Sequence, residues 1–244
     1  YRTQQATQEC LIGNERCSNM FSKVDRSTVK VAPSILSADF AHLADEVKHV
    51  TDAGIDRIHV EVGDGVFSPE ITVGAPVVKS LRKATSAIIE VHLMTVNPER
   101  KIESFAKAGA DIIIFHVETT HQAEAVLQQI KNAGSKAGVA INPATPIVML
   151  EELLPIADVV LVMTANPGSA GQRLINSTLN KIKKLHEIIR NENYDCILEA
   201  DGGINIETAA SVREAGANVL VAGTAIYEST DVLASLSKLT GESE

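Results

Sequence analysis

The sequence lacks several features that would place it in a specialised class of protein. Its 244 residues include no apolar run approaching about 18 residues, so no transmembrane helix is expected. Basic residues are not in excess: 22 Lys and Arg against 31 Asp and Glu give a net charge of −9. This balance argues against a surface that binds nucleic acid or an anionic membrane. At 45% hydrophobic and 22% charged residues, the composition is that of a soluble globular protein.

Cysteine is also scarce, and the three cysteines are poorly placed for cross-linking or metal binding. Cys10 and Cys17 lie in a polar segment, whereas Cys196 lies in an apolar, strand-like run. This pattern fits neither a disulfide framework nor a zinc knuckle. A Cys10–Cys17 bridge stays open, but the pattern favours a reduced, cytoplasmic protein, with a plastid as the alternative location.

The first 27 residues differ from the rest of the chain. Residues 1–27 are polar, show little hydrophobic periodicity and lack the apolar region of a secretory signal. We expect them to form an irregular N-terminal extension outside the core fold, whether as a native tail, a targeting remnant or a tag. Residues 28–244 are predicted to form a single domain.

From residue 29 onward, short β-branched runs alternate with longer amphipathic stretches. The predicted strands are residues 29–36, 57–62, 88–94, 112–117, 137–142, 159–164, 196–201 and 219–223. The predicted helices include residues 39–53, 76–82, 99–108, 122–133, 174–190 and 206–215, and Pro98 and Pro146 suit helix starts. Several helices are predicted to end at Gly54, Gly109, Gly134 and Gly216.

Strand–helix alternation indicates parallel strands joined by crossover helices. About eight such units are present, the number that closes a (β/α)8 TIM barrel. A doubly wound open sheet is the alternative, but it favours a glycine-rich turn after the first strand, and residues 32–36 contain no glycine. We therefore predict a single (β/α)8 barrel of the α/β class.

Functional groups of such barrels lie at the carboxyl ends of the strands. Those ends carry Ser34, His59, Glu61, His92, Met94, His116, Glu118, Asn142, Met163, Asp201, Gly223 and Thr224. In a strand, His59 and Glu61 share one face. Together with His92 and Asp201 they would offer a divalent metal a mixed nitrogen and oxygen shell. Taken singly, His92 is better explained as a hydrogen-bonded core residue, and Asp201 could simply shape the turn before Gly202.

Three successive loops after the last strands are rich in glycine. The first contains Gly168, Ser169, Ala170 and Gly171, the second Gly202 and Gly203, and the third Gly223 and Thr224. Phosphate sites of TIM barrels often use these loops. None of the loops contains Lys or Arg, so we expect a phosphate to be bound by backbone N–H groups and a helix dipole, with plain turns as the alternative.

Eight ordered segments together resemble the ribulose-phosphate 3-epimerase family of the pentose phosphate pathway. They are residues 32–40, 67–74, 91–94, 108–111, 142–146, 163–168, 199–204 and 222–226. The resemblance covers nearly all of residues 29–228 and implies an isomerase that inverts C3 of a ketopentose phosphate. The reaction that the resemblance implies interconverts D-ribulose 5-phosphate and D-xylulose 5-phosphate through an enediolate.

The resemblance also implies roles for individual residues. Glu61 and Asp201 are expected to act as acid and base, and one divalent metal, Zn²⁺ or Fe²⁺ ahead of Mn²⁺ or Co²⁺, is expected on His59, Glu61, His92 and Asp201. Substrate contacts are expected from Ser34, His92, Met94, Met163, Gly168, Ser169, Ala170, Gly171, Gly202, Gly203, Gly223 and Thr224. Similar enzymes are often dimers or hexamers, so the resemblance implies a homo-oligomer.

The sequence departs from the family pattern at three places. Glu61 stands where the family has Asp, Gly63 replaces a Met, and Ser169-Ala170 replace Phe-Gly. We expect the loss of the Met side chain to open space near the substrate, which the longer Glu61 could fill. These changes leave open an epimerase for another ketose phosphate, such as a hexulose 6-phosphate, or a catalytically impaired homologue.

Two other classes of function are weighed against the epimerase. A Schiff-base aldolase needs a lysine at a strand end, and none of the predicted strand ends carries one. A metal-assisted decarboxylase or aldolase stays open, as does a sugar-phosphate sensor without catalytic activity.

Overall fold

Eight parallel strands form a barrel in the computed structural model, which describes residues 28–168 and 171–242. The strands are β1 (Lys30–Pro33), β2 (Arg57–Gly63), β3 (Ile88–Met94), β4 (Ile112–His116), β5 (Lys136–Ile141), β6 (Val159–Met163), β7 (Ile197–Asp201) and β8 (Val219–Ala222). Each strand from β2 onward pairs with the next in the chain, and β8 also pairs with β1. A parallel bridge between Ser34 and His59 brings the end of β1 beside β2 and closes the barrel.

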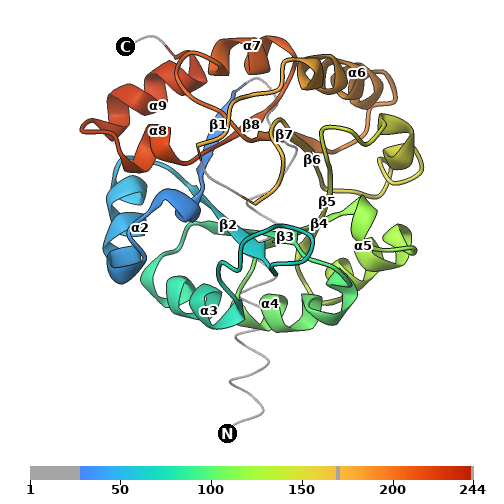
Figure 1. Cartoon of the computed structure of the whole chain (residues 1–244), viewed down its shortest axis with the longest axis horizontal. Helices are drawn as coiled ribbons and strands as arrows, with labels where there is room; N and C mark the ends of the chain where they lie inside the picture. Colours follow the sequence, from blue (N-terminus) through green and yellow to red (C-terminus); the bar gives the residue numbers. More distant parts are fainter. Residues whose placement is uncertain (1–27, 169–170, 243–244) are drawn as a thin grey trace, which may run out of the picture.

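Helices surround the strands as an outer ring (Figure 1). They are α2 (Leu43–Asp52), α3 (Ala75–Ala84), α4 (Ile102–Ala108), α5 (Ala123–Asn132), α6 (Ser177–Asn191), α7 (Ala209–Glu214), α8 (Thr224–Tyr227) and α9 (Val232–Thr240). Short 3-10 helices precede or replace several of them: Ile35–Ser37, Phe40–His42, Pro98–Arg100, Val117–Thr119 and Ile147–Leu150. The predicted (β/α)8 barrel is confirmed. The predicted extension, residues 1–27, lies outside the described residues.

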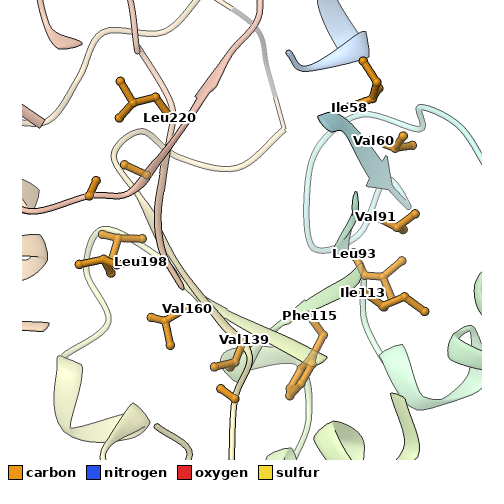
Figure 2. Packing of buried hydrophobic residues seen from close by; sticks show 14 of the residues in the cluster. Ile58, Val60, Val91, Leu93, Ile113, Phe115, Val139, Val160, Leu198 and Leu220 are labelled. Atoms are coloured by element: carbon orange, nitrogen blue, oxygen red, sulfur yellow. The ribbon is translucent and has the colours of Figure 1, made fainter. Parts of the chain in front are cut away.

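Alternate strand residues point to opposite sides of the barrel wall, as the strand period of two requires. One set, which includes Ile58, Val91 and Phe115, points outward and packs under the helices (Figure 2). The other set points into the barrel, where Ile114 and Leu161 belong to a second apolar cluster. The barrel therefore has an outer core beneath the helices and a separate inner core.

The inner core is not apolar throughout. On β2, β3 and β7 the inward positions carry Arg57, Glu90 and Glu199, all buried. Arg57 Nη1 donates to Glu90 Oε2 at 2.8 Å and to Glu199 Oε1 at 2.6 Å. A buried ion pair of this kind is stable only where each charge has a partner. This network lies directly below the strand ends that carry the candidate site.

Element boundaries differ from the predicted ones where side chains cap the backbone. The first strand ends at Pro33 because Ser34 Oγ accepts the N–H of Leu36 and begins a 3-10 helix. The predicted helix 206–215 starts only at Ala209, because Asn205 Oδ1 accepts the N–H groups of Glu207 and Thr208. Pro146 precedes a 3-10 helix rather than an α-helix. The predicted glycine stops are confirmed, with φ of +90° to +106° at the four positions.

Candidate active site

A cavity of about 150 Å³ opens at the carboxyl ends of the strands. Its wall contains two carboxylates, Glu61 from β2 and Asp201 from β7. The other predicted residues that line it are Ser34, Met163, Gly168, Gly171, Gly202, Gly203, Gly223 and Thr224. The structure thus brings the acid–base pair and the glycine-rich loops to one cavity. Ser169 and Ala170 lie outside the described residues.

Glycine is required in two of these loops by backbone geometry. Gly202 has φ +114°, and a Cβ there would lie 2.6 Å from the backbone nitrogen of Ala165. Gly203 has φ +68°, and its Cβ would lie 2.4 Å from the nitrogen of Leu174. Both positions therefore exclude larger residues, and the chain after β7 packs closely against the chain after β6.

His59, His92 and Asp201 form a compact buried group beside the cavity. His59 Nε2 and His92 Nδ1 are 3.3 Å apart. Asp201 Oδ2 lies 3.9 Å from His59 Nε2 and 3.5 Å from His92 Nδ1. Both histidines are fully buried, and neither is among the residues that line the cavity. Asp201 connects the group to the cavity because it faces both.

Glu61 does not belong to this group of three. Its Oε1 accepts the hydroxyl of Ser34 at 2.5 Å. Burial and the nearby charge of Asp201 raise the pKa of Glu61 to about 7, although His59 and Ser34 act in the opposite direction. Burial likewise raises the pKa of Asp201. Two carboxyls with raised pKa values in one cavity suit acid–base proton transfer.

His59 is held from behind by a carboxylate that sequence reasoning missed. Its Nδ1 lies 2.6 Å from Glu90 Oε1, and both side chains are fully buried. Burial opposes the charged imidazolium, but Glu90, Asp201 and Glu61 raise the pKa of His59 to about 9. Arg57 and His59 lower the pKa of Glu90 to about 2 against the effect of its burial. The feature of the sequence that could have revealed Glu90 is a charged residue at an inward-facing strand position, which Arg57, Glu90 and Glu199 share.

The pKa of His92 is also shifted by burial. His92 contacts a chain of polar groups at the end of β4. Burial and the neighbouring charges of His116 and His59 lower the pKa of His92 well below its usual range. His92 Nε2 is 2.9 Å from His116 Nε2. His116 Nδ1 is in turn 3.2 Å from Glu118 Oε2. The strand-end residues His116 and Glu118 are therefore connected to the group through His92.

The expected open space at Gly63 is absent. A Cβ at Gly63 would lie 2.3 Å from the carbonyl oxygen of Glu70 and 2.7 Å from Ser68 Oγ. The loop after β2 thus fills the position, and Glu61 turns to Ser34 instead of toward Gly63. The prediction that Glu61 fills a space left at Gly63 is wrong. Met94 is fully buried and is not among the residues that line the cavity.

The group of three has the donor set and spacing that a divalent metal requires. Asp201 Oδ2 is buried without a hydrogen-bond partner among the described residues. Tetrahedral bonds of about 2.0–2.1 Å place two nitrogen ligands about 3.3 Å apart, which matches the separation of His59 Nε2 and His92 Nδ1. Two imidazoles and a carboxylate suit zinc, iron(II), manganese or cobalt. These residues can therefore hold such an ion.

Fold and site together define a class: a (β/α)8-barrel enzyme with paired carboxylates and a candidate metal group at the barrel mouth. The sequence profile described as "Ribulose-phosphate 3 epimerase family" matches residues 30–227. The chain belongs to this family. It is accordingly an isomerase-class enzyme, an epimerase that acts on carbohydrates.

Curated relatives support this assignment over nearly the whole chain. The ribulose-phosphate 3-epimerase of Bacillus subtilis (strain 168) is 47% identical over 214 residues, which are 87% of this chain and 99% of the relative. The Synechocystis enzyme of that name is 47% identical over 201 residues, 82% of this chain and 87% of the relative. The chloroplastic ribulose-5-phosphate-3-epimerase of Arabidopsis thaliana is 44% identical over 221 residues, 90% of this chain and 79% of the relative.

Solved structures of lower identity share the fold. The crystal structure of KGPDC from Streptococcus mutans has a TM-score of 0.65 at 16% identity, covering 88% of this chain and 97% of that one. That of 3-hexulose-6-phosphate synthase has a TM-score of 0.61 at 20% identity, covering 88% and 98%. In the part of the chain that the structure describes, no helix is both long and apolar enough to cross a bilayer.

Proposed function

We propose that this enzyme inverts C3 of D-ribulose 5-phosphate to give D-xylulose 5-phosphate. The observation that carries the proposal is the position of Glu61 and Asp201, which line one cavity together with the glycine-rich loops after β6, β7 and β8. The names of the relatives, which are 42–47% identical to this chain, support the same substrate.

In the proposed reaction, the two carboxylates work from opposite faces of the substrate. One of them removes the C3 proton to give an enediolate, and the other delivers a proton to the far face, which inverts the centre. Ser34 holds the carboxylate of Glu61 by the hydrogen bond described above. Met163 provides an apolar part of the cavity wall. Backbone N–H groups of Gly171, Gly203 and Thr224 are proposed to hold the phosphate.

A divalent cation on His59, His92 and Asp201, with Glu61 as the predicted fourth ligand, would supply Lewis-acid stabilisation of the negative charge that develops on the substrate. We propose zinc or iron(II) as the resident ion, with manganese or cobalt as alternatives. Elemental analysis of protein purified without added metal, compared with a His59→Ala variant, tests both the presence and the identity of the ion.

The proposed reaction is tested by supplying carbon-13-labelled D-ribulose 5-phosphate and identifying the product by NMR. Xylulose 5-phosphate, with all five carbons retained, is the expected product. A product with a changed number of carbons would instead establish a lyase. Faster conversion of a hexulose 6-phosphate would make that sugar the substrate, and bound but unconverted sugar would indicate an impaired homologue or a sensor.

Self-association and location are the remaining proposals. We propose a homo-oligomer, a dimer or a hexamer, because Val66 and Ile71 on the loop after β2 expose 73% and 83% of their surface. Sedimentation of the wild type and of an Ile71→Ser variant tests this. A cytoplasmic location is proposed, with the plastid as the alternative, and a fluorescent fusion of the full chain distinguishes the two.

A further inference from the structure

The proposed chemistry leaves His116 and Glu118 without a role, although they extend from the candidate metal group. His116 is fully buried on β4, next to β3, and its Nε2 is 2.9 Å from His92 Nε2. The two rings have centroids 5.0 Å apart and planes 21° apart, so they are nearly parallel. The ring of Phe67 covers His116, with centroids 4.6 Å apart. This hydrogen bond is therefore shielded from water.

The donors around Glu118 give this chain of hydrogen bonds a direction. Glu118 Oε1 accepts the N–H of Asn142 at 2.8 Å and the hydroxyl of Thr145. Both donors are fixed, because Lys181 Nζ donates to the carbonyl oxygens of Asn142, Pro143 and Thr145 at 2.6–2.9 Å. The other oxygen, Oε2, faces His116 Nδ1. A carboxylate only accepts hydrogen bonds, so the proton of this contact belongs to His116 Nδ1.

The same reasoning continues to His92. A metal ion on His92 Nδ1 leaves the ring proton of His92 on Nε2, so in the short contact between the two Nε2 atoms His92 donates and His116 accepts. The lone pair of His92 is left on Nδ1, the atom that faces Asp201 Oδ2 at 3.5 Å and His59 Nε2 at 3.3 Å.

We propose that Glu118, acting through His116, is a positioning residue that fixes the ring of His92 with its Nδ1 lone pair directed at the metal position. The inference rests on the proposed function, since it assigns the Glu118–His116 pair to the candidate metal group. His59 has the equivalent arrangement in one step, because Glu90 contacts its Nδ1 directly. Carboxylates that orient metal-binding histidines in this way commonly set the ligand tautomer.

The Glu118→Gln variant tests the proposal without changing the size of the side chain. Because Oε1 is held by two donors, the amide nitrogen of the variant must take the place of Oε2 and donate to His116 Nδ1. Every hydrogen bond in the chain then reverses, and the proton of His92 moves to Nδ1. We expect the affinity for Zn²⁺, measured by competition with a chelator, to fall by about 10–100-fold, the usual cost of losing such a partner.

The matched control is Asp111→Asn, at the opposite end of β4. Asp111 Oδ2 accepts from Arg82 Nη1 at 2.7 Å and from the N–H of Ile89 at 2.8 Å. The two carboxylate side chains are comparably exposed, 21% for Glu118 and 32% for Asp111. This variant should lose stability yet keep the zinc affinity of the wild type. Equal loss of affinity in both variants would reduce the role of Glu118 to stability and overturn the proposal.

A second readout needs no variant. Nitrogen-15 NMR of the zinc-loaded wild type should show a proton on Nε2 and zinc on Nδ1 of His92. A proton on Nδ1, or unchanged zinc affinity in Glu118→Gln, overturns the positioning role while leaving the proposed function intact. A wild type that neither binds zinc nor converts D-ribulose 5-phosphate would overturn the proposed function, and this inference with it.

Discussion

Glu61 is held by the first strand rather than by the histidines beside it. Its side chain is one methylene longer than the family's Asp, and its carboxylate reaches Ser34 at the end of β1. Its backbone is fixed as well, because Thr72 Oγ1 donates to the carbonyl oxygen of Glu61 at 2.6 Å. This position in the cavity wall supports the proposed acid–base role more directly than the predicted role as a metal ligand.

Gly63 is a packing requirement of the loop after β2. Replacing it by Ala places a Cβ against the carbonyl oxygen of Glu70, which is backbone and cannot rotate away. We expect Gly63→Ala to lower the free energy of unfolding by about 1–3 kcal/mol, the usual cost of overpacking. Urea denaturation measures it.

Gly74→Ala is the control for this substitution. A Cβ at Gly74 meets only Pro76 Cδ at 3.6 Å, an ordinary contact distance. Its effect on unfolding should be clearly smaller. Equal effects of the two substitutions would show that the close approach of Glu70 is not what requires glycine at position 63.

At the scale of elements, a network of charged side chains inside the barrel connects β2, β3 and β7. Arg57 on β2 holds Glu90 on β3 and Glu199 on β7, and the pKa of Glu199 is raised well above its usual range by burial and by the charge of Glu90. Arg57 is therefore shared between two buried carboxyl groups from different strands. The network holds together the layer of side chains directly below His59 and Asp201.

Removing the arginine should be costly, because Glu90 Oε2 and Glu199 Oε1 both lose their buried cationic donor and only His59 remains beside Glu90. We expect Arg57→Met to lower the free energy of unfolding by about 3–5 kcal/mol. Thermal and urea unfolding followed by circular dichroism measure the change. Lys30→Met breaks an exposed pair with Asp56, whose side chains are 55% and 58% exposed, and should cost about 0–1 kcal/mol. Similar losses in both variants would contradict the stabilising role of the buried network.

The elements themselves were predictable where pattern alone decides them. Buried, β-branched runs predicted all eight strands to within a few residues. Helix starts were less predictable, because Asn205 and Asp39 form local hydrogen bonds that delay the following helix. The short α8 and the terminal α9 were not among the predicted helices. The competition between side-chain caps and helix is local, and hydrophobic periodicity does not report it.

At the scale of the whole molecule, the order of the strands already predicted which residues meet. Barrel closure brings His59, His92 and Asp201 together, as their places at strand ends indicated. The pairing of Arg57 with Glu199, 142 residues apart, was not predictable, because it depends on the stagger between β2 and β7. The filling of the space at Gly63 likewise depends on the path of a loop.

Acid stability of the whole fold should depend on Glu118. Although burial opposes its charge, hydrogen bonds from His116, Asn142 and Thr145 lower the pKa of Glu118 from 4.5 to about 2. A lowered pKa in the folded state adds stability above pH 4.5, and this stability is lost as pH falls through 2. We expect Glu118→Gln to flatten the decline of stability over this range, as measured by urea titrations at each pH. An unchanged decline would contradict this assignment.

Exchange of the C3 hydrogen of D-ribulose 5-phosphate with D₂O tests the central claim most directly. Wild-type enzyme loaded with metal should replace this hydrogen by deuterium, followed by proton NMR, and Glu61→Gln should slow the exchange by about 10²–10⁴-fold while the sugar still binds. A metal-loaded wild type that binds the sugar and leaves C3 unexchanged would contradict the epimerase account.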